Sequence, residues 1–195
     1  MAWPMKVKKL LFFILFLNIS VMCFPEAVSI SFSSGYFLPK QKEFKEIYGN
    51  GYPLAFEIRI NLWKNSGFSA GLEYLNRKGY ALGNEENEYP LRFKMTTIPF
   101  TVFYRYPLKR AYLSVGLGAS YNTYEERWER VEIEFNDEKW GYFIFYSAEY
   151  RIFSKFYLLA HLRYENISTG EGSFLVEDVS LGGMKILAGF SIHLF

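Results

Sequence analysis

From residue 28 onward, apolar and polar side chains alternate along stretches of about ten residues. The clearest stretch is 111–122, where apolar residues occupy every second position and small or polar residues the positions between them. A period of two residues indicates a β-strand with one apolar face. Stretches of this kind predict strands at 28–38, 54–63, 68–77, 98–105, 111–122, 140–151, 156–165 and 184–194.

Short and long connections alternate between these predicted strands. The short ones lie near Asn65, Leu108 and Ser154. The long ones are polar segments at Pro39–Asn50, Gly79–Pro90, Glu125–Glu138 and Ser168–Ser180. Alternation at Val131, Ile133 and Phe135 leaves open an earlier start for the sixth strand. Short turns at one end and longer loops at the other are typical of membrane β-barrels, whose short turns are periplasmic. An even number of strands then places both termini in the periplasm.

Charged residues lie opposite the apolar faces, deep within the predicted strands. A soluble sandwich or a lipocalin-like barrel would turn such charges toward water, whereas a membrane barrel turns its apolar face outward. Placing Arg59 against lipid would cost roughly 2–4 kcal/mol, but inside a closed ring it can pair with a carboxylate. The sequence therefore predicts an all-β fold, an eight-stranded antiparallel up-and-down transmembrane β-barrel. Its predicted interior charge network comprises Glu57, Arg59, Glu73, Glu149, Arg151, Arg163, Glu165 and Lys185.

The first 27 residues have a different character. Lysines at positions 6, 8 and 9 precede the apolar run Leu10–Val21. A basic start and a short apolar run predict a secretory signal peptide, so we assign 1–27 to the signal and 28–195 to the barrel. Cleavage next to Cys23 or Ala27 and an uncleaved anchor remain open, although the run is short for a transmembrane helix. Bulky Met22 disfavours a lipid anchor on Cys23.

Composition supports this assignment. The chain has 20 Phe, 16 Tyr and 4 Trp, yet its mean hydropathy is only −0.03. Aromatic residues favour strands and gather at the two interfaces of membrane barrels. The net charge of +2 gives no case for nucleic acid. Because Cys23 is the only cysteine and ends the leader, the mature chain is expected to contain no disulfide, cysteine metal site or thiol nucleophile.

The chain ends in Phe195, directly after the last predicted strand. A terminal Phe on an amphipathic strand resembles the signal that the barrel-assembly machinery reads in outer-membrane barrels. The segments Gly35–Pro39 and Phe44–Gly51 resemble the first hairpin of the small outer-membrane barrels of the OmpX, OmpA and OmpW type. One departure is that Ser191 and His193 hold positions in step with Phe195 that are usually apolar, so a bulge or a divergent signal is expected.

The resemblance implies a fold and an outer-membrane location, with membrane lipid and the assembly machinery as partners and extracellular contacts through the long loops. It implies no reaction. Since side chains fill an eight-stranded barrel, the inward charges predict a plug and a structural or surface-interaction role. The alternative is a conduit for small hydrophobic molecules, as suggested for the OmpW type. It is kept open by the inward apolar residues Phe143, Phe145, Leu159 and Leu187.

A lipid-modifying enzyme is the third possibility. The only histidines are His161 and His193. Their predicted positions give no support to a deacylase, which needs a His and a Ser on a surface that lipid can reach. The sequence contains no phosphate-binding loop or cluster of metal-ligand residues. No catalytic residue and no cofactor is therefore predicted.

Deletion of Phe195 is expected to slow assembly and lower the amount of folded barrel in the membrane, because the assembly signal would lose its last residue. Pulse-chase labelling followed by protease protection measures this. Replacement of Phe195 by Tyr is the control and should assemble close to normally. Equal assembly of the deletion and the intact chain would contradict a role for Phe195 in the signal.

Overall fold

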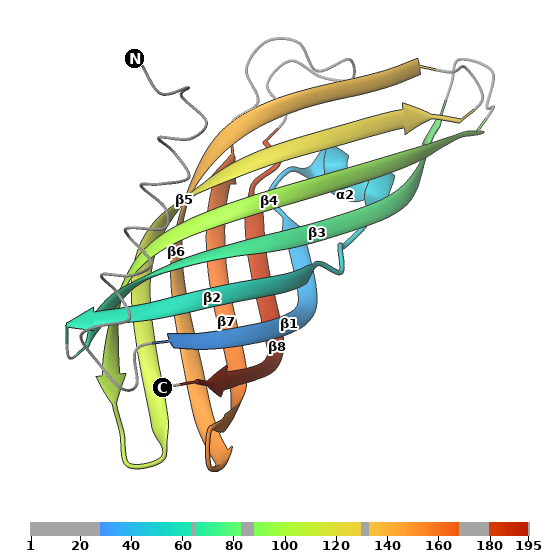
Figure 1. Cartoon of the computed structure of the whole chain (residues 1–195). Coiled ribbons are helices and arrows are strands. Elements are labelled where there is room, and N and C mark those ends of the chain that lie inside the picture. Colours follow the sequence, from blue (N-terminus) through green and yellow to red (C-terminus); the bar gives the residue numbers. More distant parts are fainter. Residues whose placement is uncertain (1–27, 64, 83–87, 130–132, 168–179, 195) are drawn as a thin grey trace, which may run out of the picture.

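The structure is a computed structural model that describes residues 28–63, 65–82, 88–129, 133–167 and 180–194. Eight antiparallel strands form a closed barrel in which each pairs with its sequence neighbours, and the first pairs with the last (Figure 1). This confirms the predicted fold class. The strands are β1 (Val28–Pro39), β2 (Leu54–Trp63), β3 (Ser66–Leu82), β4 (Glu88–Pro107), β5 (Ala111–Trp128), β6 (Ile133–Phe153), β7 (Phe156–Ile167) and β8 (Gly183–His193).

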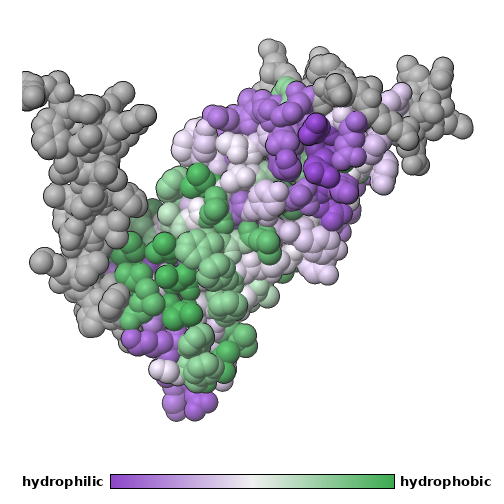
Figure 2. Space-filling view, turned by 45° about the vertical axis from the view of Figure 1, so that its right-hand side comes forward, coloured by the Kyte–Doolittle hydropathy of each residue, from purple (hydrophilic) through white to green (hydrophobic). Residues whose placement is uncertain are grey.

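Each strand turns one face outward and one inward, in the phase that the alternation predicts. Outward residues such as Leu72 and Leu158 are 50% and 55% exposed, whereas Arg59 and Arg163 are each 2% exposed. Figure 2 shows the result: apolar side chains cover the middle of the barrel and hydrophilic ones lie at both ends. The outward face therefore forms an apolar belt, and the charges are enclosed. No helix among the described residues is long and apolar enough to span a membrane.

Strands β3–β6 are 17–21 residues long, whereas the other four have 10–12. Their extra length projects beyond the rest of the barrel at the loop end (Figure 1). The bounds predicted for the loops Gly79–Pro90 and Glu125–Glu138 are therefore too wide. Most residues within these bounds continue the β3–β4 and β5–β6 ladders. Backbone hydrogen bonds extend these strands past the belt, where outward side chains need not be apolar. The earlier start of β6 is confirmed at Ile133.

The predicted loop Pro39–Asn50 contains a helix, α2 (Lys42–Tyr48), that the sequence analysis missed. Its residues Phe44 and Tyr48 lie on one face and are 6% and 3% exposed. The Arg77 guanidinium on β3 donates two hydrogen bonds, 3.1 and 3.0 Å long, to the carbonyl of Tyr48. This contact holds the end of α2 against the inner side of the projecting strands.

Several predictions concern residues outside the described ranges. These are the signal peptide at 1–27, most of the loop Ser168–Ser180, and the side chain of Phe195. Inward–outward alternation continues to Leu194, and the β1–β8 ladder has no register shift. Of the two alternatives at the C-terminus, the bulge is therefore not found within the described part of β8.

Closure of the barrel depends on a close approach between β1 and β8. A Cβ added to Gly189 would overlap the carbonyl oxygen of Phe32, and one added to Gly35 would overlap that of Ile186. Both neighbours are backbone atoms in the ladder, so neither can move without separating the strands.

Gly189→Val is expected to destabilise the barrel by roughly 1–3 kcal/mol, the usual cost of overpacking. Urea unfolding in detergent micelles, followed by tyrosine fluorescence, measures the change. Ala188→Val is the control because the adjacent Ala188 points outward and is exposed. If the two variants unfold at the same urea concentration, the close approach does not limit closure.

Candidate functional site: the charged interior

Among the described residues, the enclosed interior of the barrel contains one set of ion-paired groups, with as many carboxylates as cations. With neutral histidines, this set carries no net charge, and Glu57, at 16%, has the most exposed of these side chains. The carboxylates are Glu57, Glu73, Glu149 and Glu165, and the cations are Arg59, Arg105, Arg163 and Lys185.

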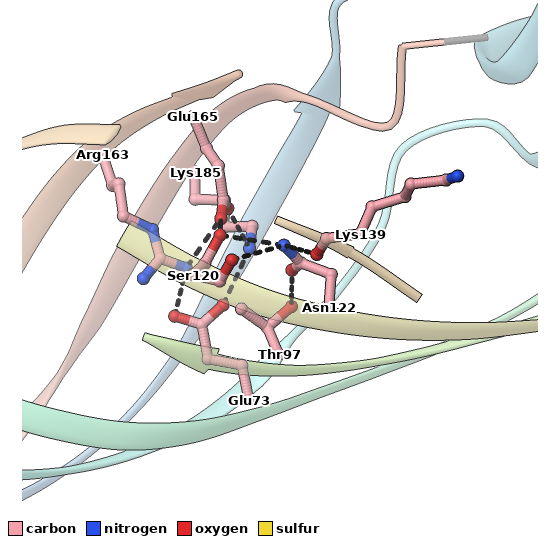
Figure 3. Close-up of polar contacts among 8 residues, drawn as sticks. All are labelled: Glu73, Thr97, Ser120, Asn122, Lys139, Arg163, Glu165 and Lys185. Atoms are coloured by element: carbon pink, nitrogen blue, oxygen red, sulfur yellow. Dashed lines mark hydrogen bonds and ion pairs between the residues drawn. The ribbon is translucent and has the colours of Figure 1, made fainter. Parts of the chain in front are cut away.

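The outer cluster lies toward the loop end and is drawn in Figure 3. Glu73 on β3 accepts hydrogen bonds from Arg163 on β7 and from Lys185 on β8, the latter 2.8 Å long. Lys185 also lies 2.8 Å from Glu165, so one ammonium bridges two carboxylates. The Arg163 guanidinium lies 4.8 Å from the centre of the Phe143 ring. Side chains from strands on opposite sides of the ring thus meet at its centre.

A chain of hydrogen bonds through uncharged side chains extends the outer cluster to β4 and β5. Ser120 donates to Glu165, and Asn122 Nδ2 donates to Ser120 Oγ at 2.8 Å. Thr97 Oγ1 donates to Asn122 Oδ1 at 2.7 Å. Each of these side chains is at most 1% exposed. They satisfy carboxylate and amide groups that would otherwise be buried without partners.

A second cluster inside the barrel, here called the inner cluster, lies toward the end with the short turns. Its members are Arg105, Glu149, Ser191 and His193. Glu149 accepts hydrogen bonds from Arg105 and from Ser191 Oγ, the latter 2.6 Å long. His193 Nε2 lies 3.5 Å from Glu149 and 3.3 Å from Arg105 Nη2. The His193 ring stacks on Tyr157 with centroids 3.9 Å apart. The histidine thus sits between the charged pair and an aromatic layer.

A separate pair lies on β2. Arg59 donates to both carboxylate oxygens of Glu57, at 3.0 and 3.1 Å, and to Ser147 Oγ at 3.2 Å. The paired donors match the two carboxylate oxygens, which is the strong geometry for this interaction. This pair connects β2 with β6 across the interior.

An apolar cluster covers the outer cluster at the loop end. Residues of α2 take part in it: the Phe44 ring lies 4.9 Å from that of Phe93 and 4.8 Å from that of Tyr48. Burial, with a smaller effect of Glu126, raises the pKa of the Tyr48 hydroxyl, so the phenol stays neutral. The buried members are Phe37, Phe44, Tyr48, Leu75, Leu91, Phe93, Met95, Tyr124, Ile167 and Leu181.

Seven of the eight predicted network residues lie in these clusters, and Arg151 does not. Arg151 is exposed at the end of β6, where the register with β7 shifts, and it forms no ion pair with a described residue. Its alternation phase is inward, but at that point the strand has passed the end of the enclosed interior. Arg105 and His193 were not predicted as members of the network, although Arg105 shares its alternation phase with Phe103.

The described residues include no group of three or more His, Cys, Asp or Glu that could hold a metal ion. The interior instead consists of matched charges, each cation lying within ion-pair distance of a carboxylate.

No family model matches the chain, and no curated protein matches it. Solved structures with the same fold include outer membrane protein OprG from Pseudomonas aeruginosa, which is 12% identical with a TM-score of 0.62 and covers 85% of this chain and 95% of its own. Neisserial surface protein A is 13% identical, with a TM-score of 0.58 and the same coverage. A major outer membrane protein from Thermus thermophilus is 13% identical, with a TM-score of 0.57, covering 85% and 98%. The chain therefore shares their eight-stranded barrel fold.

Glu73→Ala is expected to lower the free energy of unfolding by roughly 3–5 kcal/mol, because it removes a carboxylate shared by two buried cations. The midpoint of urea unfolding in micelles measures the loss. Glu43→Ala, at an exposed position on α2, is the matched control and should change stability little. Similar midpoints for the two variants would contradict the assigned importance of the interior pairs.

Proposed function

We propose that this chain is an outer-membrane β-barrel with a structural or surface-interaction role and a closed lumen. The observation that carries the proposal is the inversion of its two faces: an apolar belt outside and matched charges inside. In a bilayer, only a helix or a closed barrel can satisfy every backbone polar group. This chain forms a closed ring, and lipid would meet its outward apolar residues.

Membrane placement is also supported by aromatic residues at both edges of the belt. Tyr104 and Tyr150 are 49% and 52% exposed toward the turn end, and Trp140 and Tyr142 are 58% and 72% exposed toward the loop end. Bands of aromatic side chains around the barrel mark the two membrane interfaces of such proteins. The neighbours named above as outer membrane proteins are consistent with this location.

The proposed orientation places both termini in the periplasm, with the signal peptide removed and assembly directed through Phe195. It is supported by the position of the strand ends, since β1 begins beside the end of β8, with Ser29 opposite His193. Both ends lie on the side of the short turns.

A closed lumen is favoured over a conduit by the packing of the interior. Phe143 and Phe145 pack with Phe103 in a buried cluster instead of lining a channel. The space bounded by Glu73, Lys185 and neighbouring side chains leaves no room for a water molecule. The conduit alternative would need an open path through these contacts.

The positions of the two histidines do not favour a histidine-based lipid-modifying site. His161 and His193 are 8% and 6% exposed and point inward, where each stacks on an aromatic ring. A lipid substrate in the membrane would meet neither imidazole.

A surface-interaction role is supported by the projecting part of β3–β6. Its outward side carries a polar groove of about 580 Å³ just beyond the apolar belt. The ion pair between Lys94 and Glu125, 2.9 Å long, crosses β4 and β5 within this groove. Such a polar sheet surface could bind other envelope or extracellular components.

Cell fractionation is expected to recover the protein in the outer membrane, and the purified barrel is expected to give no discrete ion-conductance steps in planar bilayers. Folding is first checked by the heat-dependent gel mobility of the protein.

A double variant, Glu73→Ala with Lys185→Ala, removes the centre of the outer cluster and tests whether the contacts close the lumen. It is expected to leak ions where the intact barrel does not.

Recovery as a soluble periplasmic protein would overturn the membrane proposal. Stable conductance steps from the intact barrel would overturn the closed lumen alone, and would favour the conduit.

A further inference from the structure

The two ends of the barrel differ in charge. At the turn end, four cations are exposed, and no exposed acidic side chain is described there. At the loop end the signs are mixed, as on α2, where Lys42 and Glu46 pair at 3.4 Å. We call the cations at the turn end the basic turn rim; they are Lys109, Arg110, Arg151 and Lys155.

The basic turn rim lies directly at the edge of the apolar belt. Exposed apolar residues are its sequence neighbours: Leu108, Ile152 and Phe156 are 46%, 53% and 37% exposed. A strand advances about 3.3 Å per residue, so the rim charges lie within a few ångströms of the surface that hydrocarbon would cover. If a bilayer covers the apolar belt, as proposed above, this is the depth at which lipid phosphate groups would lie.

The rim cations also have no acidic partner among the residues that the structure describes. None of the four forms an ion pair within the described chain. The Lys155 ammonium donates instead to the carbonyl of Leu194, at 2.7 Å. A backbone hydrogen bond of 2.8 Å from Arg151 to Arg110 fixes two of the cations on adjacent segments. Like charges held side by side repel each other unless an anion lies near them.

We propose that the basic turn rim binds the phosphate groups of anionic phospholipids in the leaflet that faces the turns. This inference rests on the proposed membrane location. Cations at the edge of an apolar surface are attracted to anionic lipid headgroups over a short range. The rim follows the turn ends of β4–β7, as a lipid annulus would. The bilayer phosphates would supply the negative charge that the described residues lack at this end.

The test measures which lipid occupies the first shell around the folded barrel. The chain is refolded in phosphatidylcholine vesicles that carry a trace of spin-labelled phosphatidylglycerol or phosphatidylcholine. The immobilised fraction in the electron spin resonance spectrum gives the relative association of the two lipids. The intact barrel is expected to prefer phosphatidylglycerol by about twofold or more at low ionic strength.

Removing the rim charges is expected to abolish this preference and bring the ratio close to one. The variant combines Lys109→Gln, Arg110→Gln, Arg151→Gln and Lys155→Gln. A matched control removes the same number of exposed cations at the loop end and should keep the preference. It combines Lys40→Gln, Lys42→Gln, Lys45→Gln and Lys78→Gln.

Three results would overturn the inference: no preference in the intact barrel, a preference that survives in the rim variant, or an equal loss in the control. Sodium phosphate and sodium chloride at equal ionic strength separate two sources of phosphate. Equal weakening by both salts supports lipid binding, whereas a loss specific to phosphate would assign the rim to the free ion and overturn the lipid assignment.

Protection of the barrel from protease in pure phosphatidylcholine vesicles reports insertion independently of headgroup. Failure to insert would overturn the proposed membrane location, and the lipid inference with it. Insertion without headgroup preference would overturn the lipid inference alone.

Discussion

Pairing between acidic and basic side chains inside one closed sheet is the condition on which the rest of this structure depends. Because strand residues point alternately to the two faces, turning every apolar residue outward forces Glu73, Arg163 and Lys185 into the interior. A buried charge without a partner costs several kcal/mol, so these groups must meet across the ring. The bridging position of Lys185 between Glu73 and Glu165 shows how β3, β7 and β8 meet this requirement together.

Different residues cover the charged interior at its two ends. At the loop end, α2 and the apolar cluster cover the charges, and Arg77 holds the helix through the carbonyl of Tyr48. At the turn end, the His193 ring lies between Arg105 and the ring of Tyr157. The interior is thus bounded by aromatic layers, while the strands β3–β6 extend past it and carry the polar outer surface.

The sequence predicted the strands well where a belt demands strict alternation. It predicted them poorly beyond the belt, because outward positions such as Lys94 and Glu125 no longer need to be apolar. The helix α2 was missed because seven residues carry only one short apolar repeat, Phe44 and Tyr48. Arg151 was placed in the network because alternation gives the direction of a side chain but not the point where the enclosed interior ends.

The partners within the network could not be predicted either. Lys185 and Glu73 are 112 residues apart, and Arg105 and Glu149 are 44 apart. Which cation meets which carboxylate depends on strand tilt and register, and a two-residue period carries neither. The charge balance does not follow from the inward phase alone either. Phase counts Arg151 together with Arg105, and the balance appears only once the exposed Arg151 is left out of the enclosed interior.

The most direct test of the account is the environment of alternate side chains along β7 in lipid vesicles. Because the predicted mature chain has no cysteine, single cysteines at positions 157–164 can carry nitroxide labels. Power saturation with oxygen and with a water-soluble nickel complex then reports lipid or water contact at each position. The account predicts high oxygen access at positions 158, 160, 162 and 164 and low access to both reagents at 159, 161 and 163. Nickel access at the even positions, or lipid-like access at the odd ones, would contradict a membrane barrel with inward charges.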